Sequence, residues 1–197
     1  MIHEKAFEIA CKYRELFAPY CDRIEIAGSI RRGKPWPKDI ELVAIPQMQE
    51  VQALFGKSGI KVSGLSIPLK QLRQNEKFRF IKAGLRYIQI VLPEEIVLDL
   101  FIVLPPAQWG VEYLLRTGPL EFNTWLVTHR SKGGALPAFA EMHDAGIYVA
   151  RKLVEMPEEI DLLNFLGLGW LEPAERSPQW GRITFAEVPK NASVTAL

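Results

Sequence analysis

The chain has 197 residues, of which 48% are hydrophobic and 24% charged, with a formal net charge of +1. This length is enough to bury roughly 70% of the extended surface in ordinary cores. The near-neutral charge argues against a strong nucleic-acid binder that relies on charge alone. Since the sequence has no run of 18 apolar residues and no signal peptide, we expect a cytoplasmic protein without a membrane span.

Apolar residues at helical spacing predict an opening helix over 3–17, ended by Pro19. A second helix is predicted over 49–55. Strands are expected at 23–28, 38–45, 77–82, 85–92 and 95–104.

The Leu104-Pro105-Pro106 segment then breaks the pattern. Helices are predicted at 108–115 and 120–128, short strands with a Gly146 turn over 140–154, and a last helix that begins near Pro157. The tail after 178 has little pattern. We therefore expect an α+β chain of two coupled subdomains, over 1–105 and 106–197, with a mixed sheet in the first.

A tight turn is predicted directly after the first strand, in Gly28-Ser29-Ile30-Arg31-Arg32-Gly33. Because Gly28 has no Cβ, a ligand can approach the backbone N–H groups and the Ser29 hydroxyl closely. Arg32 supplies a planar two-pronged donor to the same ligand. These are the groups that bind phosphate oxygens, so Gly28, Ser29 and Arg32 form a candidate nucleotide-phosphate site.

Three carboxylates complete the candidate site. Asp39 and Glu41 alternate with apolar residues, which places both on one face of a strand, roughly 6 to 7 Å apart. Asp99 stands alone in an apolar strand, where a charge is costly unless a metal or a partner compensates it. Oxygen ligands suit Mg²⁺, and two such ions can serve displacement at phosphorus. Each feature alone also has an ordinary interpretation, as a solvated turn, a polar strand face, or a carboxylate paired with an arginine.

The order GSIRRG, DIE, LDLF and then Thr117-Gly118 with Asn123 resembles the DNA polymerase X family, over roughly residues 1–178. The resemblance implies a nucleotidyltransferase palm over 1–105 and a small α/β thumb over 106–197. It also implies a DNA-directed polymerase that adds dNMP to a primer 3′-hydroxyl and releases pyrophosphate, with gap-filling repair as its use. The expected partners are primer/template or gapped DNA and dNTP, and a monomer is expected.

The resemblance also assigns roles to individual residues. Asp39, Glu41 and Asp99 match the catalytic metal triad, for two Mg²⁺ ions or Mn²⁺ in their place, with Asp99 as the proton acceptor for the primer hydroxyl. Thr117 and Gly118 match the turn under the incoming sugar, and Asn123 matches the residue that contacts the base. The family pattern further implies a structural ion pair for Arg31 and a cis peptide at Gly118-Pro119.

Several positions depart from the family pattern. Glu41 stands where Asp is usual, Leu115-Arg116 replaces an aromatic pair that helps exclude ribonucleotides, and Val127 replaces an arginine that faces the template. The chain reaches its phosphate turn by residue 28, so no lyase or fingers region is expected. Template-independent end addition and transfer to a non-DNA acceptor therefore stay open, as does a catalytically silent nucleotide- or nucleic-acid-binding module.

Charge is distributed unevenly along the chain. Residues 1–105 hold 16 Lys and Arg against 12 Asp and Glu, whereas residues 106–197 hold 8 against 11. The basic first half suggests a nucleic-acid-binding surface, although its alternating pattern also fits a solvated amphipathic strand. The candidate nucleic-acid contacts are Lys77, Arg79, Lys82, Arg86, Arg116 and Arg130. Cys11 and Cys21 lack metal-site spacing and are expected to be reduced thiols.

Overall fold

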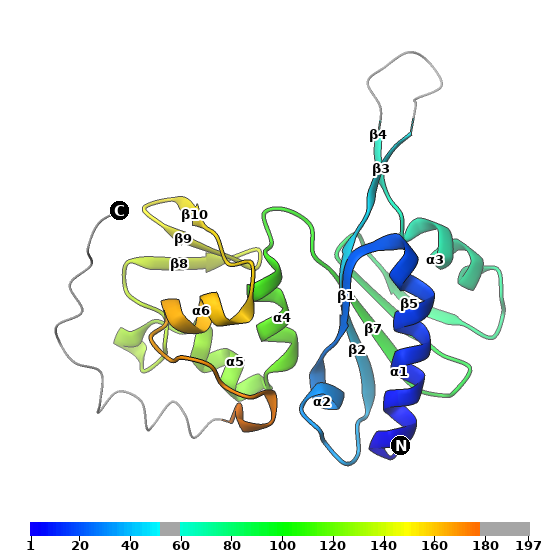
Figure 1. Ribbon diagram of the computed structural model, residues 1–197, viewed down its shortest axis with the longest axis horizontal. Helices are drawn as coiled ribbons and strands as arrows, with labels where there is room; N and C mark the ends of the chain where they lie inside the picture. Colours follow the sequence, from blue (N-terminus) through cyan, green and yellow to red (C-terminus); the bar gives the residue numbers. More distant parts are fainter. Residues whose placement is uncertain (52–59, 178–197) are drawn as a thin grey trace.

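The computed structural model describes residues 1–51 and 60–177, and Figure 1 shows its two halves side by side. The first half contains a five-stranded mixed sheet in the order β1-β2-β7-β6-β5. In this sheet β2 and β7 are parallel, and the other neighbouring strands are antiparallel. The second half contains a three-stranded antiparallel sheet, β10-β9-β8, with helices packed against it. The predicted α+β fold with a mixed sheet is confirmed.

The bounds of the elements follow in chain order. The first half comprises α1 (His3–Phe17), a 3-10 turn (Ala18–Tyr20), β1 (Cys21–Ile26), α2 (Gly28–Arg31), β2 (Asp39–Pro46), β3 (Met48–Val51), β4 (Ile60–Ser63), α3 (Ser66–Arg73), β5 (Arg79–Ala83), β6 (Tyr87–Val91) and β7 (Val97–Ile102). The second comprises α4 (Trp109–Thr117), α5 (Leu120–Val127), a 3-10 turn (Arg130–Lys132), β8 (Ala140–His143), β9 (Gly146–Val149), β10 (Lys152–Val154), α6 (Glu159–Phe165) and a 3-10 turn (Pro173–Glu175).

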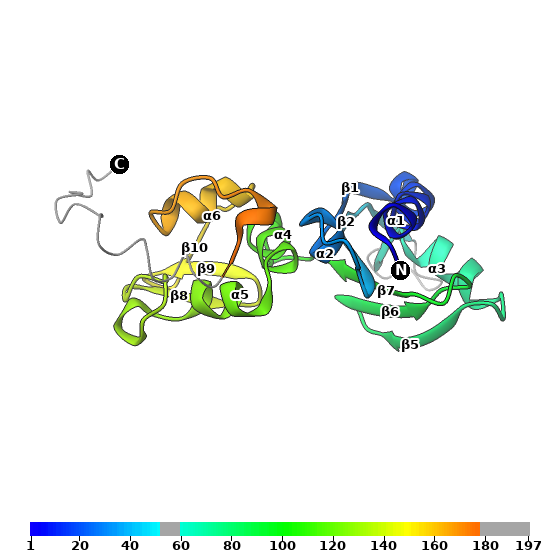
Figure 2. The ribbon, with the colours of Figure 1, turned by 90° about the horizontal axis from the view of Figure 1, so that it is seen from below.

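The two faces of the large sheet differ in character. One face is covered by α1 and α3 (Figure 2), and its core includes Ile40, Leu42, Leu98 and Leu100. Because side chains alternate along a strand, Asp39, Glu41 and Asp99 lie on the opposite face. The apolar residues that alternate with these carboxylates are buried under α1 and α3. The carboxylates therefore lie on the face that α1 and α3 do not cover.

Aromatic packing and charged contacts join the two halves. Trp109 and Tyr113 of α4 pack in a small cluster with Val43 and Phe101 of the large sheet. The Arg31 guanidinium makes two hydrogen bonds to the Glu159 carboxylate, at 2.7 and 2.6 Å. The structural ion pair predicted for Arg31 is present, and it links α2 to α6.

Glu159 has a second cationic partner. The buried Arg176 donates from Nη1 to Glu159 Oε1 at 2.7 Å. Burial acts to raise the Glu159 pKa, but the hydrogen bonds from Arg31 and Arg176 outweigh it and hold that pKa below its usual value. A charged carboxylate is thus shared by two guanidinium groups at the junction of the two halves.

Several local predictions differ from the structure. Residues 48–51 form strand β3, which pairs antiparallel with β4, so the helix predicted over 49–55 is wrong at its start, and residues 52–59 lie outside the described part. The predicted strands did not include β4, and no helix was expected at α3. The predicted turn in the second sheet lies at Asp144-Ala145, both with positive φ, and Gly146 is already in β9.

One proline prediction is wrong and another is confirmed. Within residues 1–51 and 60–177 a cis peptide is found at Pro105-Pro106, in the connection between β7 and α4, whereas Gly118-Pro119 is trans. The last helix begins near Pro157 as predicted, although Pro157 lies just before the N-cap Glu158, which forms a reciprocal capping box with Asp161. The predicted tail after 178 lies outside the described residues. Among the helices of residues 1–51 and 60–177, none combines the length and apolar composition that a bilayer crossing requires.

Candidate functional site

The turn after β1 brings glycine and carboxylate into direct contact. Gly28 begins α2 with φ +62°, a conformation that residues with a Cβ rarely adopt. A Cβ at this position would lie 1.5 Å from Glu41 Oε2 and 2.4 Å from Glu41 Cδ. The Ala27 N–H also donates to the Glu41 backbone oxygen at 2.8 Å, which fixes the turn against β2. Both the backbone conformation and the position of the Glu41 side chain therefore favour glycine here.

The three predicted carboxylates are brought together by strand pairing. Glu41 on β2 and Asp99 on β7 are directly opposite each other in the parallel register, and Asp39 is two residues before Glu41. Neighbouring strands lie about 4.7–4.9 Å apart, so the three side chains start from adjacent positions on one face. All three are half-buried.

Burial and mutual repulsion raise the pKa of Asp39 and Glu41. Burial, followed by the neighbouring Asp39, raises the Glu41 pKa to about 7, although Arg32 and a backbone hydrogen bond from Ser29 oppose the shift. Burial and the Asp99 charge raise the Asp39 pKa in the same direction. A bound cation would oppose both pKa shifts, since it supplies positive charge next to carboxylates that have lost water.

The side chains do not converge on one point. Within residues 1–51 and 60–177, no three His, Cys, Asp or Glu side chains are arranged so that they could hold a metal ion together. Glu41 lies against Gly28, while one oxygen of Asp99 is hydrogen-bonded by its own sheet. The donor set nevertheless fits a hard divalent cation, because it consists of three oxygen ligands with unrelieved repulsion on one face.

The predicted phosphate ligands leave polar atoms without partners in the described part of the chain. Ser29 Oγ and Arg32 Nε are buried and have no hydrogen bond there. Arg32 Nη1 donates to the Thr117 backbone oxygen, and burial lowers the Arg32 pKa while Glu41 and Asp39 counteract the shift. The Ser29 hydroxyl and the Arg32 Nε–H, both buried with unmet hydrogen bonds, suit an anionic ligand.

The residues predicted to bind sugar and base have structural roles in this conformation. Thr117 is fully buried, and its hydroxyl accepts a hydrogen bond from Arg31 at 2.7 Å. Asn123 Nδ2 donates to the backbone oxygens of Leu115 and Gly118, at 2.5 and 2.9 Å. Asn123 Oδ1 is buried without a partner among the described residues, and it lies 2.2 Å from a Cβ built on Gly118. These residues hold the α4–α5 turn, and their contact with a nucleotide stays a prediction.

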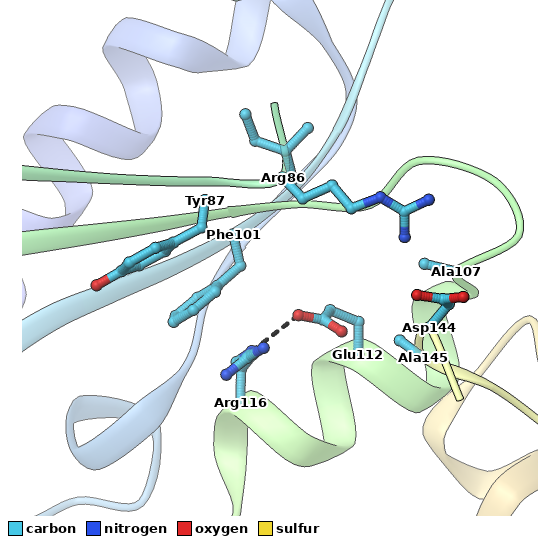
Figure 3. A pocket seen from close by; sticks show the side chains of 9 residues that line it. Arg86, Tyr87, Phe101, Ala107, Glu112, Arg116, Asp144 and Ala145 are labelled. Atoms are coloured by element: carbon cyan, nitrogen blue, oxygen red, sulfur yellow. Dashed lines mark hydrogen bonds and ion pairs between the residues drawn. The ribbon is translucent and has the colours of Figure 1, made fainter. Parts of the chain in front are cut away.

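A cavity of about 490 Å³ lies between the large sheet, α4 and the β8–β9 turn (Figure 3), and Tyr87, which donates to Asp99, is part of its wall. Its walls include Arg86, Tyr87, Phe101 and Arg116. The Tyr87 and Phe101 rings are stacked with centroids 5.1 Å apart, and the Arg116 guanidinium lies 4.0 Å from the Phe101 ring centroid. Stacked rings with two arginines suit a ligand that has flat bases and phosphates.

The predicted nucleic-acid contacts fall into three groups. Arg86 and Arg116 line the cavity, and each has a partner: Arg86 donates to the Pro105 oxygen at 2.9 Å, and Arg116 pairs with Glu112 at 2.8 Å. Lys77, Arg79 and Lys82 are exposed on or beside the edge strand β5. Arg130 instead donates to the Ala135 and Leu166 backbone oxygens within the second half. The first two groups lie in the first half or at its junction with α4.

Sequence patterns missed two polar residues of the site. Tyr87 Oη and Gln89 Nε2 both donate to Asp99 Oδ1, at 2.7 and 2.9 Å. Burial and the Asp99 hydrogen bond raise the Tyr87 pKa to about 12, so Tyr87 keeps its proton at ordinary pH. In the sequence, the two residues appear only as polar side chains that alternate with Ile88 and Ile90. That they bind Asp99 follows from the register of β6 on β7, which the sequence does not show.

Comparison with known proteins gives a fold relationship. No family model and no curated protein sequence matches the chain. The structure is similar to the crystal structure of Leishmania infantum polymerase beta in a ternary P/T complex, with a TM-score of 0.66 and 15% sequence identity. The similarity covers 90% of this chain and 77% of that one. The chain therefore has a polymerase beta-like fold.

Proposed function

We propose that the protein is a DNA polymerase X-like nucleotidyltransferase that adds dNMP to a primer 3′-hydroxyl and releases pyrophosphate. The observation that carries the proposal is the placement of Asp39, Glu41 and Asp99 beside the Gly28 turn, on a polymerase beta-like fold. Few reactions other than phosphoryl or nucleotidyl transfer need metal-binding carboxylates next to a turn that can bind phosphate. In this proposal residues 1–105 act as the palm and residues 106–197 as the thumb.

Each group of the site has a role in the proposed reaction. Gly28, Ser29 and Arg32 bind the dNTP phosphates through backbone N–H groups, the free hydroxyl and the guanidinium. Asp99 accepts the proton of the primer hydroxyl at its free oxygen. Asp39, Glu41 and Asp99 would hold Mg²⁺, which lowers the pKa of the attacking hydroxyl and neutralises charge on the phosphates.

The basic residues of the first half are the proposed DNA-binding surface. The exposed Lys77, Arg79 and Lys82 would follow the primer or template backbone, while Arg86 and Arg116 line the cavity. The small net charge favours moderate affinity, and we propose that the protein acts as a monomer in gap filling. Thr117, Gly118 and Asn123 would contact the nucleotide after a rearrangement of the α4–α5 turn.

Substitution of the carboxylates tests this chemistry. Asp39→Asn and Asp99→Asn should each lower dNMP transfer at least about 100-fold, because each removes a charged ligand from the reacting centre. Asp22→Asn, an exposed carboxylate on β1 of the same sheet, is the matched control and should keep wild-type turnover. Unchanged turnover in either site variant, with folding confirmed by circular dichroism, would remove the basis of the assignment.

A second candidate keeps the chemistry and changes the acceptor. Val127, which stands where template-dependent polymerases place an arginine, is 36% exposed at the end of α5 and offers no charge to a templating base. This favours end addition to an unannealed strand or transfer to a non-DNA acceptor. Equal extension of free and annealed primers would select this candidate, and nucleotide binding without any product would indicate a silent module.

A further inference from the structure

The Asp99 carboxylate is asymmetric in its surroundings. Its Oδ1 accepts both the Tyr87 hydroxyl at 2.7 Å and the Gln89 amide at 2.9 Å. No hydrogen bond from the described residues reaches its Oδ2. Both distances are typical of well-formed hydrogen bonds to a charged acceptor. One oxygen is therefore anchored to the sheet, and the other is available to a reacting group.

Strand register produces this arrangement. Gln89 on β6 is directly opposite Asp99 on β7, and Tyr87 is opposite Phe101 in the same antiparallel ladder. Residues two apart on a strand share a face, so both donors lie on the face of the carboxylates. The donors come from regular strands, which hold a side chain more precisely than a loop does.

The Tyr87 ring is itself restrained. It stacks on Phe101 with an interplanar angle of 18°, and Lys82 Nζ lies 5.3 Å from its centroid. Phe101 is in turn covered by the Arg116 guanidinium (Figure 3). Because its ring is packed in this way, the Tyr87 hydroxyl cannot leave Asp99 without disturbing the cavity wall.

We propose that Tyr87 and Gln89 are positioning residues that bind Asp99 Oδ1 and thereby keep Asp99 Oδ2 directed at the reacting hydroxyl. The inference rests on the proposed function, since it assigns Asp99 a part in the transfer step. Tyr87 and Gln89 act through Asp99 and do not touch the substrate in this role. Losing such a support around a ligand or base typically costs 10- to 100-fold in activity or metal affinity.

Two substitutions remove one donor each while keeping side-chain size. Tyr87→Phe and Gln89→Met should each lower kcat about 10-fold, with the KM for dNTP within about 2-fold of wild type. The matched control is Tyr13→Phe, which removes a hydroxyl that donates to Glu94 Oε2 at 3.1 Å on the other side of the same sheet. It should leave kcat unchanged and should shift the urea midpoint of unfolding by an amount similar to that of Tyr87→Phe.

A binding readout separates this inference from the proposed function. Mn²⁺ affinity, measured by electron paramagnetic resonance, should fall about 10-fold in Tyr87→Phe and in Asp99→Asn. The double variant should show no further loss, because Tyr87 acts only through Asp99. If wild type transfers no nucleotide to any acceptor, the proposed function fails and this affinity pattern still decides the positioning role. Wild-type kcat and Mn²⁺ affinity in Tyr87→Phe, or additive losses in the double variant, would overturn the inference.

Discussion

Replacement of Gly28 by alanine perturbs the contact on which the site is built. The new Cβ would be placed 1.5 Å from Glu41 Oε2 on a backbone with φ +62°. The left-handed conformation costs a residue with a Cβ about 1–2 kcal/mol. The collision itself costs less, because the Glu41 carboxylate is the end of a flexible chain and can rotate away. We therefore expect the free energy of unfolding to fall by about 1–2 kcal/mol in Gly28→Ala.

Activity should respond much more strongly than stability. Moving the Glu41 carboxylate displaces one of the three proposed metal ligands by more than 1 Å, and misplacement on this scale can cost about 100-fold in rate. The assay is single-nucleotide transfer with urea unfolding measured in parallel. The matched control is Gly33→Ala, because Gly33 has φ +67° in the same turn and nothing lies within 4 Å of its Cβ position.

Gly33→Ala separates the effect of backbone strain from the effect of the Gly28–Glu41 collision. Gly33→Ala should lose the same stability as Gly28→Ala and keep nearly normal turnover, since it carries the backbone strain without the collision. If both variants lose activity equally, backbone strain in the turn is responsible and the Gly28–Glu41 contact is not. If Gly28→Ala is fully active, the position of Glu41 has no bearing on the reaction.

Three further outcomes are expected. The pKa of Glu41 is about 7 in the folded protein, above its unfolded value, so the stability that protonation provides is present below about pH 4.5 and is lost as pH rises to 7. Without divalent cations, Glu41→Gln should therefore be about 1–3 kcal/mol more stable than wild type at pH 8 in urea unfolding. An equal difference between the two proteins at pH 4 and pH 8 would contradict this. Glu159→Ala should cost about 3–5 kcal/mol because it leaves two guanidinium groups unpaired at the junction, whereas Lys12→Ala, which breaks an exposed pair, should cost under about 1 kcal/mol; similar thermal unfolding of the two variants would argue against the buried network. Arg79→Ala should weaken DNA binding for all sequences alike, and the slope of log K against log salt concentration, measured by fluorescence anisotropy, should fall in magnitude by about 1. An unchanged slope would mean that Arg79 does not contact a phosphate of the DNA.

The periodicity of apolar residues predicts secondary structure correctly where local preference and tertiary packing agree. The helix predicted over 3–17 is confirmed, because its buried residues recur at helical spacing. The carboxylates share a face because alternation on a strand is independent of its partners. Their proximity across β2 and β7 was inferred, and the parallel register of Glu41 with Asp99 confirms that they are neighbours.

Features that depend on pairing were beyond sequence patterns. A helix is predicted over 49–55, yet pairing of residues 48–51 with β4 makes those residues a strand. The helix α3 was missed because it is short and contains Pro68 in its first half. The roles of Tyr87 and Gln89 depend on the register of β6 on β7, which a single sequence does not specify.

The α4–α5 turn depends on packing in the same way. Thr117 and Asn123 stay predicted nucleotide contacts, and in this conformation their side chains bind Arg31 and the turn backbone. These partners come from α2 and from the turn itself, so only the packing of the two halves identifies them. A cis bond was expected at Gly118-Pro119, but tertiary context, which sets the isomer of each X-Pro bond, gives a trans bond there.

Extension of a labelled primer tests the central proposal most directly. The primer is presented alone and across a one-nucleotide gap, with each dNTP or rNTP singly and with Mg²⁺ or Mn²⁺. The proposed function predicts template-matched addition of one dNMP in the gap, with release of pyrophosphate. Absence of any product on the gapped substrate, under conditions where the protein is folded and binds nucleotide, would contradict it.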